Sequence, residues 1–332
     1  MLTSHNVCSV PSSFQLTGIP GLESLHIWLS IPFGSMYLVA VVGNVTILAV
    51  VKVEHSLHQP MYFFLCMLAV IDLVLSTSTM PKLLGIFWFG AGDIGLDACL
   101  AQICSASTSS LSLTAILLVM ALDRYVAICY PLRYPKLVTA QLLAGLLGAA
   151  AARSTCIVAP VVGLASQVRF CRSHIIHHFA CEHMALMKLS CGDISLNKTV
   201  GLTVRIFNRV LDMLLLGASY SRIIHAAFRI SSGRARSKAL NTCGSHLLVI
   251  FTVYSSTMSS SIVYRVARAA SQDVHNLLSA FYLLLPCLVN PFIYGARTKE
   301  IRQHLATLFQ RAQLPAPPEK PQSLPPHGEL PT

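Results

Sequence analysis

The chain has 332 residues, of which 54% are hydrophobic and 11% are charged, and its formal net charge is +11. Soluble domains contain roughly 25% charged residues, so this composition indicates a membrane protein and excludes an ordinary soluble enzyme. The basic residues lie in short clusters between apolar segments and form no single soluble basic face, which argues against nucleic-acid binding.

Apolar segments follow one another along the chain, and each is long enough to cross a bilayer, which takes about 20 residues. These seven segments are residues 27–51, 61–84, 98–128, 142–165, 200–224, 239–263 and 277–296. Because short loops join them, we predict an all-α membrane protein in which residues 27–296 form one bundle of seven transmembrane helices. The sequence shows no internal repeat, which disfavours an inverted-repeat transporter.

The basic residues predict the orientation of this bundle. The first is Lys52, and most of the others gather at residues 124–136, 222–238 and 297–311. Segments of this kind stay in the cytoplasm, which makes residues 1–26 an extracellular N-terminus. That N-terminus lacks the basic start and apolar core of a cleavable signal, so we expect the first span to direct insertion.

The C-terminal segment follows the last span. Apolar residues at helical spacing predict a short amphipathic eighth helix over residues 297–313, lying on the cytoplasmic membrane surface. Residues 314–332 are rich in proline, and we predict that they are disordered.

An acid and a base stand side by side at the inner end of the third span, as Asp123 and Arg124. Charges at the end of a spanning helix are costly and usually functional. Pro131 predicts a helix boundary close by, because proline has no N–H to donate. The pair is either a charge pair that extends toward the headgroups, or a switch in which Asp123 holds Arg124 until a partner protein competes for it.

Three polar residues, Asn44, Asp72 and Asn290, recur at mid-depth in the first, second and seventh spans. Gly43 and Pro291 beside them allow close packing and a kink. We expect a polar network that rearranges when the bundle moves. The alternative is a static set of hydrogen bonds between helices.

The longest outer loop carries Cys171, Cys181 and Cys191, and Cys99 opens the third span. Four cysteines allow three pairings. We favour Cys99–Cys181, which would tie the loop across the mouth of the bundle, with Cys171–Cys191 closing the loop internally. A loop held in this way would cover a pocket.

Hydroxyl side chains fill the outer halves of the third span, at residues 105–110, and of the sixth, at residues 254–261. Small hydroxyl residues either let helices pack closely or leave room for a ligand. Two such stretches at similar depth, below a disulfide-linked loop, favour a ligand pocket.

The fifth span contains Arg205, Arg209 and Asp212. We expect Arg209 and Asp212, three residues apart, to neutralise each other. Arg205 and, at the outer end of the sixth span, Arg265 either extend toward the headgroups or bind an anion.

The sequence contains no Gly-x-Ser-x-Gly, His-Glu-x-x-His or phosphate-loop motif, so it predicts neither an enzyme nor a cofactor. His178 and Glu182 lie in a histidine-rich part of the outer loop, where imidazoles and a carboxylate at short spacing suit a metal. Because Cys181 between them is better used in a disulfide, we predict no metal site.

Longer motifs carry a resemblance to a known family. Asp123-Arg124-Tyr125 and the seventh-span residues 290–294 (NPFIY) look like those of rhodopsin-type G-protein-coupled receptors. Four further motifs resemble olfactory receptors, at residues 57–62 (LHQPMY), 120–129 (MALDRYVAIC), 219–220 (SY) and 238–246 (KALNTCGSH). Three more point to the class I, or fish-like, branch, at residues 16–23 (LTGIPGLE), 86–89 (IFWF) and 294–299 (YGARTK).

This resemblance, which runs from about residue 14 to 309, implies an odorant receptor. A small volatile or acidic organic ligand is expected within the bundle, where it activates a stimulatory, olfactory-type G protein and raises cyclic AMP. The implied location is the plasma membrane, in the cilia of olfactory sensory neurons.

The resemblance also implies roles for individual residues. The ligand contacts are expected at Ser107, Thr108, Tyr254, Ser261 and Arg265. The switch toward the G protein is expected to use Asp123, Arg124, Tyr125, Tyr220, Lys238, His246, Asn290 and Tyr294. The two disulfides favoured above match the pattern of the family. Class I members often bind carboxylic acids through a basic residue at the position of Arg265, since its planar fork suits a carboxylate.

The chain departs from the family pattern at several positions. Ser107 stands where class I relatives commonly carry His, and Leu113 stands where a Glu is thought to help Asp72 hold sodium. For glycosylation, Asn197 starts an Asn-Lys-Thr acceptor, whereas Asn6 is followed by Val-Cys, without the usual Ser or Thr. These departures leave one alternative to an active receptor, a folded relative that does not signal or traffics poorly. A second alternative is a membrane transporter that uses the polar helices as a pathway.

Overall fold

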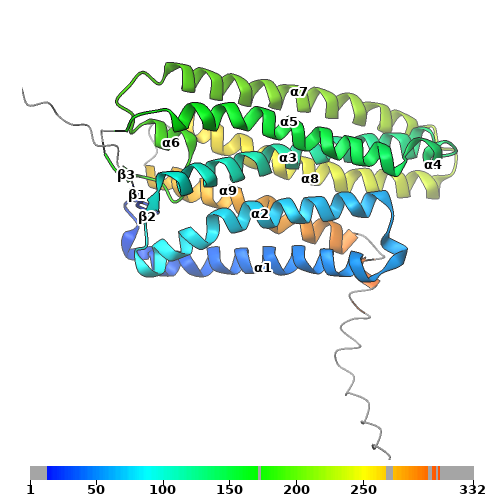
Figure 1. Ribbon diagram of the computed structural model, residues 1–332. Coiled ribbons are helices and arrows are strands. Elements are labelled where there is room, and N and C mark those ends of the chain that lie inside the picture. Colours follow the sequence, from blue (N-terminus) through cyan, green and yellow to red (C-terminus); the bar gives the residue numbers. More distant parts are fainter. Residues whose placement is uncertain (1–12, 171–172, 267–271, 298–300, 304–305, 307–332) are drawn as a thin grey trace, which may run out of the picture.

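The computed structural model describes residues 13–170, 173–266, 272–297, 301–303 and 306, apart from the side chains of residues 259–266, 272, 296 and 297. In this part of the chain, seven helices of at least 26 residues run side by side (Figure 1). They are α1 His26–Val53, α2 Pro60–Phe89, α3 Leu96–Cys129, α5 Ala140–Ser166, α7 Ser195–Phe228, α8 Gly233–Val266 and α9 Gln272–Arg297. Each predicted span lies within one of them, so the helix bundle is confirmed.

Local chemistry explains where several helices start and stop. Pro60 occupies the first turn of α2, where its missing N–H costs no hydrogen bond. The same helix ends at Gly90, whose φ of 63° lies in the left-handed region that glycine tolerates. At the start of α5, the hydroxyl of Thr139 accepts a hydrogen bond from the Leu142 amide at 3.2 Å. After Tyr130, the short α4 Tyr134–Leu137 follows Pro131.

Among the described residues, five helices are long and apolar enough by themselves to cross a membrane: α1, α2, α3, α5 and α9. The remaining long helices, α7 and α8, are as long as the others but more polar. Charged side chains interrupt α7 at Arg205, Arg209 and Asp212, and six of residues 255–261 of α8 are Ser or Thr. Of these two helices, α8 carries one of the hydroxyl stretches from which a ligand pocket was predicted.

Large apolar side chains cover the outside of the bundle. Trp28 on α1 is 69% exposed, and Phe207 and Leu214 on α7 are 64% and 67% exposed. Exposed apolar surface on this scale fits contact with lipid rather than with water.

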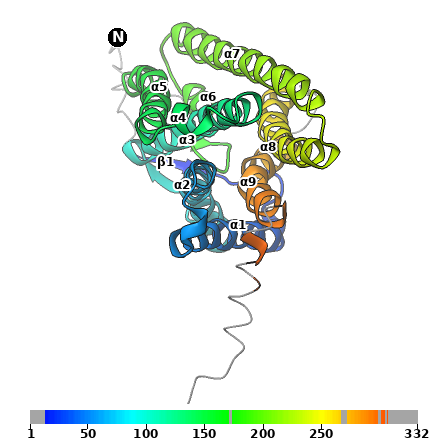
Figure 2. The same ribbon diagram turned by 90° about the vertical axis from the view of Figure 1, so that its right-hand side faces the viewer.

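Helix α3 lies in the middle of the bundle when it is viewed end-on (Figure 2). It packs against α2, α5, α7 and α8. Elsewhere, α1 approaches α9 closely at Gly43, where an added Cβ would lie 2.9 Å from the Pro291 Cβ. Gly43 was predicted to allow close packing, and the residue that packs against it is Pro291.

A small sheet covers one end of the bundle, which we call the sheet end. Its strands are β1 Ser13–Leu16, β2 Asp93–Gly95 and β3 Ile175–Ile176, in the order β2-β1-β3. The central β1 is antiparallel to β2 and parallel to β3. Successive side chains of a strand point to opposite faces, so Phe14 and Leu16 both point inward and are buried. The sequence did not predict this sheet.

Chain segments near both termini lie mostly outside the described residues. Of the predicted eighth helix, residue 297 ends α9, and residues 301–303 and 306 are described and helical. The predicted disordered tail and residues 1–12 fall outside entirely. Two short helices complete the sheet end, η1 Glu23–Leu25 and α6 His183–Met187, and η2 His55–Leu57 joins α1 to α2.

Candidate functional site

Asp123 lies at the end of α3 opposite the sheet end, and two donors hold it. The Arg124 Nη2 and Nε donate to Asp123 Oδ2 at 2.5 and 3.0 Å. The Tyr134 hydroxyl, from α4, donates to Asp123 Oδ1 at 2.7 Å. Burial and the adjacent carboxylate raise the pKa of the Tyr134 phenol, so it remains a protonated donor. Asp123 is therefore fully paired inside the protein while it restrains Arg124.

Three buried side chains predicted for the switch lie near Arg124. Tyr220 from α7 and His246 from α8 are 5% and 1% exposed, and Tyr294 from α9 is 3% exposed. The His246 and Tyr294 rings meet at a centroid distance of 5.7 Å. Their hydroxyl and ring-nitrogen groups have no hydrogen-bond partner among the described residues. The cluster thus holds unused donors and acceptors beside a restrained arginine.

Two further switch candidates lie near the same end of the bundle. Tyr125 contacts the Tyr130 ring at a centroid distance of 5.9 Å, and Lys238 is exposed near the start of α8. Neither is part of the buried cluster.

The polar network predicted between α1, α2 and α9 exists, although its members do not all touch one another. The Asn290 amide donates to Asp72 Oδ2 at 2.9 Å. Asn44 instead donates to the backbone carbonyls of Ala40 and Cys287, at 2.9 and 3.0 Å. Asp72 Oδ1 and Asn290 Oδ1 are buried without a hydrogen-bond partner in the described part of the chain. Asn44 therefore links α1 to α9 through the backbone, while Asn290 links α9 to α2.

The predicted ligand contacts lie on α3 and α8. Ser107 and Thr108 are partly buried, and Tyr254 is 3% exposed. Ser261 and Arg265 belong to α8, but their side chains lie outside the described residues.

The predicted pairing of Arg209 with Asp212 is wrong. Arg153 of α5 reaches across to α7, where its Nη2 lies 2.6 Å from Asp212 Oδ1 and 2.9 Å from Asn208 Oδ1. Arg209 instead donates to Ser110 Oγ at 3.1 Å, and its guanidinium carbon lies 5.6 Å from the centroid of the Tyr254 ring. Close spacing along α7 did not decide the pairing, because Asp212 faces α5 while Arg209 reaches α3 and α8.

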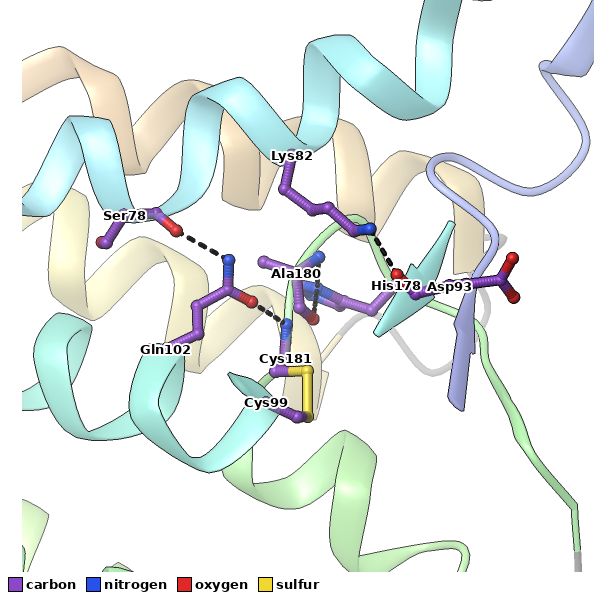
Figure 3. Close-up of a disulfide and its surroundings, with 8 residues drawn as sticks. All are labelled: Ser78, Lys82, Asp93, Cys99, Gln102, His178, Ala180 and Cys181. Carbon is purple, nitrogen blue, oxygen red and sulfur yellow. Dashed lines mark hydrogen bonds between the residues drawn. A yellow bond between two sulfur atoms is a disulfide. The ribbon is translucent and has the colours of Figure 1, made fainter. Parts of the chain in front are cut away.

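The outer loop is held to α3 as predicted (Figure 3). A disulfide joins Cys99 to Cys181, and Gln102, one turn along α3, accepts a hydrogen bond from the Cys181 amide at 2.7 Å. The other end of the Gln102 amide donates to the Ser78 carbonyl on α2, also at 2.7 Å. Gln102 thus fixes the loop to two helices. Cys191 is disulfide-bonded, whereas its predicted partner Cys171 lies outside the described residues.

His178 lies in the same loop and is 8% exposed. Its Nδ1 is 3.0 Å from the Ala180 carbonyl, and its Nε2 is 3.6 Å from Glu182 Oε2. Burial lowers the pKa of His178, and the Glu182 carboxylate opposes that shift. No group of three or more His, Cys, Asp or Glu side chains in the described residues is arranged to hold a metal ion.

A cavity of about 300 Å³ opens beside His178, lined also by Pro20, His177, Glu182 and Lys188. It lies in the loop at the sheet end and not between the hydroxyl stretches of α3 and α8.

Of the two glycosylation candidates, Asn197 is in the first turn of α7 and is 7% exposed. That burial does not favour attachment of a bulky glycan. Asn6 lies outside the described residues.

Sequence reasoning missed two residues of the site. Tyr134 follows Tyr130 by four residues, beyond the predicted helix boundary at Pro131. Nothing in that spacing indicated that α4 would place its side chain against Asp123. Arg153 was the one basic residue inside the fourth predicted span, and a lone charge in a span is itself a signal for a buried partner.

The bundle, the Asp-Arg pair and the buried aromatic cluster are the features of a rhodopsin-type G-protein-coupled receptor. Comparison with known proteins makes the class more specific. Residues 33–312 match a family model described as olfactory receptor. The chain is 46% identical to olfactory receptors 52K1 and 52K2 of Homo sapiens over 314 residues, which is 95% of this chain and 100% of each relative.

A third relative, olfactory receptor 52P1 of Homo sapiens, is 46% identical over 303 residues, covering 91% of this chain and 94% of that protein. The chain therefore belongs to the olfactory receptor family, which is a family of multi-pass membrane receptors and not of enzymes. The resemblance seen in the sequence is confirmed.

Proposed function

We propose that the protein is an odorant receptor in which a small volatile or acidic ligand binds among α3, α7 and α8 and activates a stimulatory, olfactory-type G protein. The result is a rise in cyclic AMP. The observation that carries this proposal is the restrained Arg124, held by Asp123 next to buried tyrosines that have unused hydrogen-bonding groups.

The mechanism follows from the two partners that Asp123 holds. In the structure, Arg124 and Tyr134 both donate to its carboxylate. Outward movement of α8 would carry His246 away from Tyr294 and open space for Arg124 to reach the G protein. A ligand drives this change only if it binds the open bundle more tightly than the closed one.

The ligand is proposed to reach the bundle from the sheet end. Ser107 and Thr108 on α3 and Tyr254 and Ser261 on α8 supply hydroxyl groups, and Arg265 supplies a positive charge nearer that end. The Cys99–Cys181 disulfide holds the outer loop over them.

The proposed orientation places the sheet end outside the cell and Arg124 in the cytoplasm. Its support is the distribution of basic residues, which begins at Lys52 and continues through the segments that connect or follow the helices at the Arg124 end. The proposed site of action is the plasma membrane of olfactory cilia.

The test is a cyclic AMP assay in cells that express the full chain and the olfactory stimulatory G protein, challenged with acids, alcohols and esters. Labelling of the cell surface measures display of the receptor in the same cells. We expect a concentration-dependent response to at least one compound class, and its loss in Arg124→Gln at equal display. A wild-type receptor that is well displayed yet silent to every compound would favour the alternative of a folded, non-signalling relative.

A further inference from the structure

The charges buried in the middle of the bundle do not balance. Arg153 and Asp212 form an ion pair at 2.6 Å, and the Asp212 side chain is only 1% exposed. Arg153 also donates to Asn208. That leaves two arginines near one acid, because Asp212 contacts Arg153 directly and acts on Arg209 only from beyond ion-pair distance.

The side chains that contact Arg209 directly are neutral. Its Nη2 donates to Ser110 Oγ at 3.1 Å, and its guanidinium carbon lies 5.6 Å from the centre of the Tyr254 ring. Its Nη1 is buried and has no hydrogen-bond partner among the described residues. A buried cation in a spanning helix costs free energy unless an anion or acceptor pairs with its unused donors.

We propose that Arg209 is the anion-binding residue of this receptor, and that its free Nη1 takes a carboxylate oxygen of the odorant. This inference rests on the proposed function, and it assigns recognition of the acid to a site between α3, α7 and α8. The carboxylate would bring the local charge to zero. A guanidinium suits this role because several of its N–H groups lie in one plane and can donate to a carboxylate in pairs.

The neighbours of Arg209 support a ligand site rather than a purely structural one. Ser110 and Tyr254 orient the guanidinium from two helices, so the direction of the free N–H is fixed before a ligand arrives. Each of the three residues lies near the middle of its helix, which places the acid deeper in the bundle than Arg265. The apolar part of the odorant would then extend from this point toward the hydroxyl stretch of α3.

Arg205 provides the matched control. It lies one turn from Arg209 on the same helix and carries the same charge, but it is exposed on the surface of the bundle. Replacing Arg205 tests the loss of a basic residue from α7, whereas replacing Arg209 also removes the buried donor.

The experiment compares wild type, Arg209→Gln, Arg209→Lys and Arg205→Gln in the cyclic AMP assay, with display measured on the same cells. The probes are a series of straight-chain carboxylic acids with their methyl esters and primary alcohols. We expect Arg209→Gln to weaken the potency of acids by roughly tenfold to a hundredfold, since one hydrogen bond to a charged group is lost. Esters should be unaffected, Arg209→Lys should lose less, and Arg205→Gln should respond to acids like wild type.

Unchanged acid potency in Arg209→Gln would overturn the inference. An equal loss of potency for acids and esters would also overturn it, because that result would mean that Arg209 has a structural role. A wild type that answers esters but no acid would overturn it while leaving the proposed function intact.

A second measurement does not depend on signalling. The thermal unfolding temperature of the purified full-length receptor should rise with an acid probe, and Arg209→Gln should abolish that rise. A rise in a receptor that is silent in cells would support Arg209 and contradict the proposed coupling. No acid-dependent rise in wild type would overturn the inference.

Discussion

Two arginines of the bundle interior, Arg124 and Arg209, meet opposite conditions. At one end, Arg124 has a carboxylate beside it in the chain and 2.5 Å away in space. In the middle, Arg209 has only a serine hydroxyl and a tyrosine ring. A paired arginine can serve as a switch because a competitor must displace its partner, whereas an unpaired one is open to a ligand. The difference separates the end that we propose signals from the part that we propose senses.

The largest expected effect on stability comes from replacing Arg153. Arg153→Gln leaves Asp212 buried without its counter-ion, and breaking a buried pair in this way costs about 3–5 kcal/mol. We expect a large drop in the unfolding temperature of the purified receptor and poor surface display. The double variant Arg153→Gln/Asp212→Asn should recover most of the loss. If it is as unstable as the single variant, the ion pair is not what holds α5 to α7.

Tyr134 tests the paired end. Tyr134→Phe removes a hydrogen bond to a carboxylate, which is worth about 1.5–3 kcal/mol, and leaves Asp123 Oδ1 buried without that donor. The resting arrangement is weakened, so ligand-free cyclic AMP should rise, by up to about tenfold. Tyr130→Phe is the control, because Tyr130 is 45% exposed and packs on Tyr125 instead. Equal basal activity in wild type and Tyr134→Phe at equal display would show that Tyr134 does not restrain the switch.

His178 is an intermediate case, a buried base whose acid partner Glu182 is 40% exposed. Burial lowers the pKa of His178 below its ordinary value of 6.5. The folded state then binds fewer protons than the unfolded state, so stability is fully present above pH 6.5 and is lost as the pH falls below it. We expect the unfolding temperature to fall on acidification, and His178→Gln to flatten that dependence. The exposed neighbour provides the control, as His177→Gln should keep the wild-type slope.

The smallest effect is expected at Arg209 in the absence of ligand. Replacing Arg209 leaves no acid without its ion-pair partner. Arg209→Gln should therefore cost at least about 2 kcal/mol less stability than Arg153→Gln. Thermal unfolding of the two purified variants measures the difference. Equal losses would mean that another group neutralises Arg209 as strongly as Asp212 neutralises Arg153.

The sequence predicted those parts of the molecule in which the signal is local. Spans are read from continuous apolar runs, and Asp123 and Arg124 are adjacent in the chain, so both were recognised. Asn290 and Asp72 were matched although they are far apart, because polar residues at similar depth in apolar helices have few other partners. The same reasoning was incomplete for Asn44, which binds backbone carbonyls that no residue type reveals.

Partners that depend on the rotation of a helix were not predictable. Arg209 and Asp212 looked like a pair by spacing, but the choice between Arg209 and Arg153 depends on which side of α7 faces α5. The sheet was missed for a related reason. Its strands have two to four residues each, and β1 pairs with segments that lie far along the chain. Such short segments carry no periodic pattern of their own.

The most direct test of the receptor proposal measures nucleotide exchange on the purified olfactory stimulatory G protein, driven by the receptor in lipid nanodiscs. The compounds are an acid and its methyl ester, chosen from the cell assay. We expect the active compound to accelerate exchange with wild type and to have no effect with Arg124→Gln. A compound that raises the unfolding temperature of the wild-type receptor but leaves the exchange rate unchanged would contradict the proposal that ligand binding releases Arg124 to the G protein.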